Sequence, residues 1–441
     1  MAILKIFFIF ISFYCSQIAL AAKYHGRFTA GSFIAKENFT TQTAGINSND
    51  FNILSSRLYL HLSDLGSEKY IFVSDIRDKH DFFNKLDKEQ LELTSKNQLQ
   101  VRKFYIQKGG TRDKQRYKLG RFAVTQAGSI YLDGAQADIQ LFDHINFALF
   151  AGLNPKKELE SHLEFETKAI NKGVSSVYFK RIKKKGSYYF LANAIIEQTY
   201  DGEVDRRFLF HNSIIQSDHY HRFTSLLYFD FAPSMKIQNL WLNYWHNMKN
   251  NFSYSLSANR VDVIEYIRRS GIRETLPGSI YDHVKIKVKH RKRRGLTTHY
   301  LLSHGHRQSD GLTKSVAQIG WNFNRFLKKK MNSYIQLGYR KNFTSNDIFT
   351  KLGVSYFSKD WEYSIDQQFI LEDRSGVSRI PTITELICAH NYSREVFTSL
   401  SVQYARDGEV KIFSTFIKLS YRFGSTAIAP IRGFAPNQGN L

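Results

Sequence analysis

The sequence predicts an all-β fold, a single antiparallel, up-and-down transmembrane β-barrel of about 18 to 22 strands. The first reason is a repeated alternation of apolar and polar residues with a period of two. In segment 411–423 one alternate set is Phe413, Thr415, Ile417, Leu419, Tyr421 and Phe423, and the other includes Ser414, Lys418, Ser420 and Arg422. Only a closed sheet satisfies all backbone hydrogen bonds of strands in lipid. Repeated segments of this kind therefore predict a barrel wall.

About twenty-two segments show this alternation and are bounded by turn-forming or polar residues. Their ranges are 24–35, 52–65, 69–82, 97–108, 117–126, 135–142, 145–153, 174–182, 188–199, 205–216, 222–231, 237–247, 252–266, 281–291, 296–307, 312–326, 332–343, 348–358, 361–371, 383–392, 396–406 and 410–423. Lengths near ten residues suit strands that cross a membrane.

The second reason is the lengths of the connections, because bacterial barrels alternate short periplasmic turns with longer extracellular loops. The long connections follow odd-numbered segments, near 36–51, 83–96, 154–173, 267–280 and 372–382. The tight connections follow even-numbered segments, around Lys184, Asp218, Lys249, Arg293, Lys329, Lys359 and Ser393. This order predicts that both ends of the barrel domain lie in the periplasm.

The third reason is an export signal at the N-terminus. Lys5 precedes an apolar stretch, 6–14, and Ala19-Leu20-Ala21 matches a small-residue cleavage site. We therefore expect residues 1–21 to be a signal peptide, 22–423 the transmembrane barrel and 424–441 a short C-terminal tail. Cys15 offers a lipid-attachment site as an alternative, but the bulky Tyr14 before it disfavours that interpretation.

Composition agrees with a barrel and excludes other classes. The longest apolar candidate after the signal is 145–153, too short for a membrane helix. The 36 Phe and 25 Tyr suit aromatic girdles. A net charge of +23 raises the possibility of nucleic-acid binding, but the export signal and the lack of a zinc-finger, P-loop or RNP-type motif argue against it. Cys388 is alone in the mature chain, which excludes an intramolecular disulfide or a cysteine zinc cluster.

Strand parity predicts which charges face the lumen. Ile286 and Val288 suit the lipid face, so Lys285, Lys287 and Lys289 would form a ladder inside, because a lysine facing lipid at mid-membrane costs roughly 2 to 4 kcal/mol. The same parity predicts further pore-lining residues: Arg57 with His61, Arg222, Arg340, Lys418 and Arg422. The alternative is that these charges pair with the inward acids Asp230, Glu362 and Asp366 in a narrow or filled interior.

The chain resembles porin-like outer-membrane β-barrels of Gram-negative bacteria. Tyr421-Arg422-Phe423 is similar to the aromatic-ended last strand that the barrel-assembly machinery reads, although residues 424–441 extend past the expected terminal Phe. Tyr421 and Phe423 are therefore the expected assembly signal. A weaker similarity to some porin-like proteins lies in their Gly-Arg, Asp-Gly and aromatic-Ala-Gly pattern, matched here by Leu119-Gly120-Arg121-Phe122, Asp133-Gly134-Ala135 and Phe150-Ala151-Gly152.

The resemblance implies a location in the outer membrane, contact with lipid and lipopolysaccharide, small solutes as cargo and a possible homo-oligomer, with no cofactor and no nucleic acid. In general porins a long loop folds into the pore and carries acids. The connection 154–173 contains helix-forming residues, and by this resemblance its acids are candidates for a constriction loop: Glu158, Glu160, Glu164 and Glu166. A solvated surface loop is the alternative.

Catalytic and metal sites are not predicted. His306 and Ser309 superficially resemble the His-Ser segment of outer-membrane phospholipases, but residues three apart on a strand face opposite ways. His219 and His221 share a face but lack a third metal ligand.

The function expected from the sequence is passive diffusion of small anionic solutes through a non-enzymatic channel. A structural or adhesive barrel and, less favoured, a hydrolase built into a barrel remain alternatives. An active transporter would need a plug domain, for which the predicted strands leave no room.

Overall fold

The structure is a computed structural model of the chain. It describes residues 23–41, 45–81, 97–110, 113–127, 130–155, 165–181, 187–200, 203–216, 221–232, 235–248, 251–262, 280–292, 295–325, 330–374, 376–408 and 410–424. No helix in these ranges is long and apolar enough to cross a membrane.

The described chain is almost entirely strand. The first strands are β1 (Lys23–Thr41), β2 (Gly45–Leu65), β3 (Tyr70–Asp81), β4 (Asn97–Lys108), β5 (Gln115–Val124), β6 (Ile130–Phe142), β7 (Ile145–Pro155) and β8 (Phe165–Arg181). They are followed by β9 (Tyr188–Tyr200), β10 (Glu203–Gln216), β11 (His221–Ala232), β12 (Lys236–Asn247), β13 (Phe252–Asp262), β14 (Ile280–Arg291), β15 (Leu296–Arg307) and β16 (Thr313–Arg325). The last are β17 (Met331–Lys341), β18 (Asn346–Phe357), β19 (Trp361–Arg374), β20 (Val377–Arg379), β21 (Thr382–Asn391), β22 (Val396–Asp407) and β23 (Val410–Gly424). A 3-10 turn, η1 (Thr125–Ala127), joins β5 to β6.

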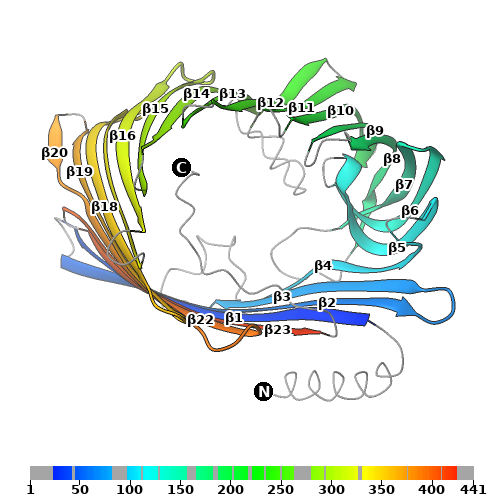
Figure 1. The fold of residues 1–441 in the computed structure, drawn as a ribbon, viewed down its shortest axis with the longest axis horizontal. Helices are drawn as coiled ribbons and strands as arrows, with labels where there is room; N and C mark the ends of the chain where they lie inside the picture. Colours follow the sequence, from blue (N-terminus) through cyan, green and yellow to red (C-terminus); the bar gives the residue numbers. More distant parts are fainter. Residues whose placement is uncertain are drawn as a thin grey trace.

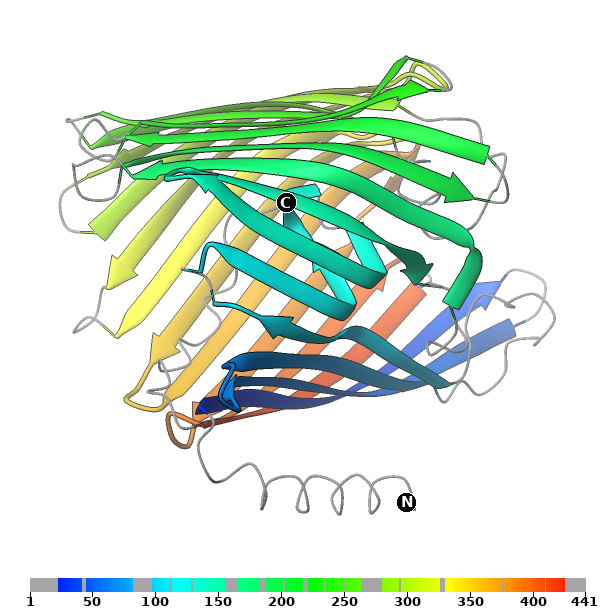
Figure 2. The same ribbon diagram turned by 90° about the vertical axis from the view of Figure 1, so that its right-hand side faces the viewer.

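These strands form one closed antiparallel barrel (Figure 1). Each strand pairs with its neighbours in the sequence, and β1 pairs with both β2 and β23, which closes the wall. The short β20 pairs only with the end of β19, and β21 continues along the same edge, so twenty-two strands make the wall. Figure 2 shows that the strands run obliquely along the barrel wall. The predicted fold class and strand number are confirmed.

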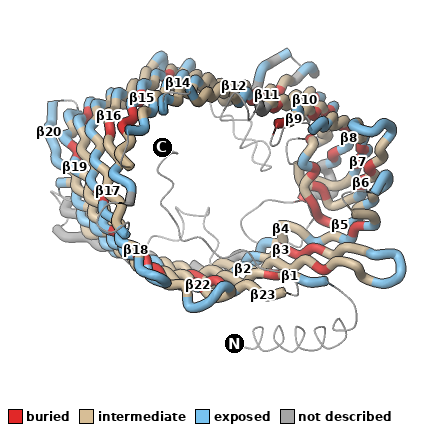
Figure 3. The backbone as a smooth tube through the Cα atoms, in the orientation of Figure 1, coloured by how far each residue is buried: buried red, intermediate tan, exposed pale blue. Residues whose placement is uncertain are grey.

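Exposed residues alternate with less exposed ones along many strands of the wall (Figure 3). Directly opposed residues of antiparallel strands share a face, so the strand registers identify which residues lie on the same face all around the barrel. On the outer face large apolar side chains are exposed, among them Leu119, Leu149, Val284, Ile348 and Leu371. Their sequence neighbours on the inner face are mostly small or polar. This distribution is the one that lipid outside and water inside would select.

An aromatic girdle marks the rim where β1 begins and β23 ends. Its outer-face members include Trp361, Tyr363, His390, Tyr392, Tyr421 and Phe423. The Trp361 and His390 rings lie 4.0 Å apart, centroid to centroid, across the β19–β21 pair. Aromatic rings of this kind sit at the boundary between hydrocarbon and water.

Several connections are shorter than the sequence predicts. The predicted connection 36–51 is largely strand, because β1 extends to Thr41 and β2 starts at Gly45. Likewise β8 begins at Phe165, inside the predicted connection 154–173. These extensions are rich in Asn, Thr, Ser and charged residues. A pair of strands that projects beyond lipid needs no apolar face. These extensions therefore lack the alternation of apolar and polar residues by which strands are predicted from the sequence.

Candidate functional site

A hairpin of the wall folds into the lumen. β4 pairs with β5 only between residues 104–108 and 117–121, although β4 begins at Asn97. Beyond this short pairing, β6 is the strand that β5 pairs with among the described residues, and the hairpin β5–η1–β6 turns inward (Figure 1). The sequence did not predict an inward element here.

Three glycines form a row where the hairpin bends. Gly120 of β5 lies opposite Gly134 of β6, which lies opposite Gly152 of β7. A Cβ atom on Gly134 would overlap the Ala151 carbonyl oxygen, and one on Gly152 would lie 2.7 Å from the Asp133 carbonyl oxygen. Gly120 also has φ of 122°, which other residues rarely adopt. The row therefore permits a close backbone approach that larger residues would prevent.

An apolar cluster holds the hairpin against the inner wall. The hairpin contributes Phe122, Val124, Ala127 and Leu132, all of them 1% exposed or less. The wall contributes Phe150, Ala194, Ile196, Leu209 and Tyr228 from β7, β9, β10 and β11. Burial of each large apolar side chain contributes about 1.5 to 3 kcal/mol. This packing makes the inward position of the hairpin a stable part of the fold.

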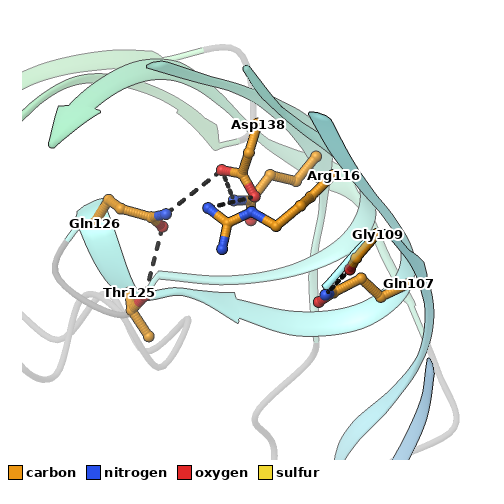
Figure 4. Close-up of polar contacts among 7 residues, drawn as sticks. Gln107, Gly109, Arg116, Thr125, Gln126 and Asp138 are labelled. Carbon is orange, nitrogen blue, oxygen red and sulfur yellow. Dashed lines mark hydrogen bonds and ion pairs between the residues drawn. The ribbon is translucent and has the colours of Figure 1, made fainter. Parts of the chain in front are cut away.

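Asp138 on β6 ties the η1 turn to the base of the hairpin (Figure 4). Its carboxylate accepts hydrogen bonds from the side-chain amides of Gln136 at 2.7 Å and Gln126 at 3.5 Å. Arg116 lies 3.5 Å from the same carboxylate. Gln126 belongs to η1, so the tip of the hairpin is bonded to a residue near the opposite end of β6.

A buried ion pair stabilises the bend itself. Arg121 donates through Nε and Nη2 to the two carboxylate oxygens of Asp133, both at 2.6 Å. The two side chains are 9% and 8% exposed. Arg121 also donates through Nη1 to the Val101 carbonyl oxygen of β4 at 3.1 Å, beyond the point where β4 and β5 separate. The Val101 carbonyl oxygen has no β5 residue paired with it, and Arg121 supplies a hydrogen bond to it instead.

The three lysines of β14 lie on the inner face, where the sequence placed them. Across from Lys285, Lys287 and Lys289 stand Ser257, Ser255 and Ser253 of β13, in the same order. No ion pair joins these lysines to an acid within the part of the chain that the structure describes. We refer to the six residues as the Lys–Ser strip. Ammonium and hydroxyl groups both donate hydrogen bonds, so the strip suits oxygen anions.

Two of the other predicted pore-lining cations are neutralised by acids. Arg57 donates through Nε and Nη2 to Asp75 at 2.7 Å each, and the Asp75 side chain is 4% exposed. Arg340 bonds Asp347 at 2.6 Å, and that carboxylate also accepts from Ser345 Oγ at 2.9 Å. The alternative raised from the sequence is pairing with Asp230, Glu362 and Asp366, whereas the observed partners are Asp75 and Asp347. These two pairs reduce the net positive charge of the lumen.

The remaining predicted cations also lie on the inner face. Arg222 is exposed and has no ion pair to the acids that the structure describes. Lys418 and Arg422 flank the buried Ser420, whose hydroxyl accepts a hydrogen bond from Arg27 Nε at 3.0 Å. This places a second basic region on β23 and β1, away from β14.

The acids considered as partners lie mainly on β19. Glu362 and Asp366 are on the inner face, and the Tyr334 hydroxyl donates to Asp366 at 2.6 Å. Asp366 stands opposite Glu385 of β21, which accepts from Ser401 Oγ at 2.8 Å. Asp366 and Glu385 thus accept hydrogen bonds from hydroxyl groups. The side chain of Asp230 lies outside the described residues.

The constriction-loop candidates fall mostly where the structure gives no description. Glu158, Glu160 and Glu164 lie outside the described residues. Glu166 lies in β8, opposite Asn154 of β7, so at this position the chain is strand. Within the described ranges, the inward element is the β5–β6 hairpin. Its signal in the sequence was the Gly-Arg and Asp-Gly pattern, which contains two glycines of the row and both members of the buried ion pair.

Two histidine arrangements are unfavourable as sites from the sequence. Ser309 lies in the turn after β15, and His219 lies outside the described residues. His304 Nδ1 lies 2.8 Å from Ser315 Oγ on the outer face, a pair that the sequence search missed, but it has no acid partner among the described residues to orient it. His221 and His246 stack with ring centroids 4.0 Å apart and their Nδ1 atoms 2.9 Å apart, and His221 Nδ1 also lies 2.8 Å from the Tyr244 hydroxyl oxygen. The described residues contain no group of three or more side chains suited to a metal.

Tyr421 and Phe423 lie together on the outer face of β23, with ring centroids 5.8 Å apart. Replacing both by serine is expected to reduce insertion at least severalfold, because the end of the last strand would lose its apolar anchors. Heat-modifiable barrel in outer-membrane fractions measures this. F413S, at the other end of the same strand, is the control. Truncation after Gly424, which pairs with His25, is expected to be tolerated. Loss of the barrel on truncation alone would contradict this assignment of the last strand.

Comparison with known proteins places the fold. No protein-family model and no curated protein sequence matches the chain. Among solved structures, the P pilus usher (PapC) translocation pore aligns with a TM-score of 0.55 at 9% identity, over 91% of this chain and 100% of that one. OccK9 (OpdG) of Pseudomonas aeruginosa aligns with a TM-score of 0.46 at 6% identity, over 91% and 98%. OccAB4 of Acinetobacter baumannii aligns at 0.42 and 7%, over 91% and 98%.

The similarity to the usher pore, at this identity, concerns the fold alone. It agrees with the closed wall seen here. The resemblance to outer-membrane β-barrels predicted from the sequence is therefore confirmed at the level of fold.

Proposed function

We propose that the chain is an outer-membrane channel that lets small anionic solutes diffuse passively, without catalysis. The observation that carries this proposal is the Lys–Ser strip, which presents three lysines without acidic partners among the described residues to the inside of a closed barrel. Barrels of sixteen or more strands enclose an aqueous channel unless a segment fills them, and this wall has twenty-two.

The geometry supports a local field for anions. Lysines two apart on a strand are separated by about 6.8 Å, so the outer two of the ladder are about 14 Å apart. This exceeds the Debye length of about 8 Å at physiological salt, so each lysine acts mainly on ions close to it. Anion preference is therefore expected to be strongest in dilute electrolyte. The outer-face girdle and exposed apolar side chains support the membrane location.

The reversal potential in a salt gradient tests the proposal. Wild-type protein in planar bilayers is expected to prefer chloride to potassium. Changing Lys285, Lys287 and Lys289 together to Glu is expected to abolish or invert that preference, because three positive charges on the inner face become negative.

A matched control changes the same net charge elsewhere. K180E/K341E/K359E alters two outer-face lysines and one in a turn, and should leave the reversal potential near the wild-type value. If the wild type conducts without anion preference, or if both triple variants behave alike, the strip is not on the ion path. A barrel that inserts but does not conduct would favour the structural or adhesive alternative.

A further inference from the structure

The inner face beside the Lys–Ser strip carries two tryptophans. Trp241 and Trp245 of β12 lie on the same face as Arg222 of β11 and Ser255 of β13. Trp241 is 37% exposed, and Trp245 is half-buried. The other tryptophans of the chain, Trp321 and Trp361, lie on the outer face. Large aromatic side chains exposed to a water-filled lumen are costly to hydrate, so a ligand that covers them is stabilised.

Four neighbouring strands align these side chains in one row. Arg222 stands opposite Trp245, Trp245 opposite Ser255, and Ser255 opposite Lys287. With strands about 4.8 Å apart, the backbones of Arg222 and Lys287 are separated by about 14 Å, with the indole and the hydroxyl between them. The adjacent inner row adds Asn243 beside Ser257. One wall thus presents cations, an aromatic face, hydroxyls and an amide within reach of one small molecule.

We infer that this row binds anionic saccharides, an inference that rests on the proposed channel function. A sugar ring has an apolar face of C–H groups that can stack on the Trp245 indole, and its hydroxyls suit Ser255 and Asn243. Acidic substituents on the sugar pair with Lys287 and Arg222, neither of which has an acidic partner among the described residues. A simple anion would leave the tryptophans bare, and a neutral sugar would leave the cations unused.

Three probes separate these contributions. Trigalacturonate carries sugar rings and charge, maltotriose carries rings without charge, and citrate carries charge without rings. Binding is read by fluorescence of detergent-solubilised W321F/W361F protein, in which the inner-face Trp241 and Trp245 are the only tryptophans left. Block of the ion current in planar bilayers gives a second reading.

Trigalacturonate is expected to quench this fluorescence at concentrations at least tenfold below those needed for maltotriose or citrate. W245A is expected to weaken trigalacturonate binding roughly tenfold, measured by current block, because the indole contributes the apolar contact. W245F should restore most of the affinity. K287Q should weaken trigalacturonate binding severalfold and leave maltotriose unchanged.

The outcomes separate this inference from the proposed function. Equal affinity for citrate and trigalacturonate would overturn the saccharide inference and leave an anion channel. Equal affinity for maltotriose would overturn it in favour of a neutral-sugar site. Tight trigalacturonate binding in a barrel without anion preference would support the saccharide site and contradict the proposed ion selectivity. Unchanged binding in W245A, in protein that remains heat-modifiable, would also overturn the inference.

Discussion

Replacing Asp133 by asparagine is expected to release the β5–β6 hairpin from the inner wall. The substitution leaves Arg121 buried with no compensating charge, and breaking a buried pair in this way costs about 3 to 5 kcal/mol. The barrel wall does not depend on this pair, so the loss should appear as local opening, not global unfolding. Single-channel conductance should rise and fluctuate, and trypsin should cut the folded protein at Lys118 or Arg121.

An exposed ion pair provides the control. Arg307 bonds Asp310 in the turn between β15 and β16, with side chains 32% and 37% exposed, and lowers the pKa of that carboxyl group. Exposed pairs contribute about 0 to 1 kcal/mol. D310N should therefore leave conductance and protease resistance unchanged. If D133N also behaves like the wild type in both measurements, the ion pair does not hold the hairpin in the lumen.

The wall of the barrel could be predicted from the sequence because its constraint is local. Successive residues of a strand face opposite sides of the sheet, and the side that faces lipid tolerates only apolar side chains. The pattern of each segment therefore indicates which of its residues face lipid and which face the lumen. The ladder of Lys285, Lys287 and Lys289 follows from the two apolar residues between them, without knowledge of any other strand.

Features that join distant segments could not be predicted in this way. Arg57 is neutralised by Asp75, which stands opposite Tyr59 on the next strand and therefore diagonal to Arg57. Arg340 is neutralised by Asp347, which stands directly opposite it across a turn. Only the register reveals which acids lie within reach. The inward hairpin is harder still, because β5 and β6 continue to alternate while they leave the wall. Its bend depends on three glycines from three strands meeting in one row.

That row gives the prediction with the largest effect on assembly. Replacing Gly134 by valine places a branched side chain where even a Cβ atom would overlap the Ala151 carbonyl oxygen. Backbone atoms of paired strands cannot move aside as a flexible side chain can, so the cost should exceed the roughly 1 to 3 kcal/mol typical of overpacking. Either β6 separates from β7 or the hairpin straightens. Heat-modifiable barrel in outer-membrane fractions should fall severalfold, with G134A intermediate.

Gly31 supplies the matched control within the same wall. A Cβ atom on Gly31 of β1 would lie 3.3 Å from the Ile417 carbonyl oxygen, a contact that a small shift relieves. G31A should therefore assemble at nearly the wild-type level. Wild-type assembly and conductance in G134V would show that the close approach of the three glycines is not what bends the hairpin. The apolar cluster around Phe122 and Leu132 would then have to hold the hairpin inward without a preformed bend.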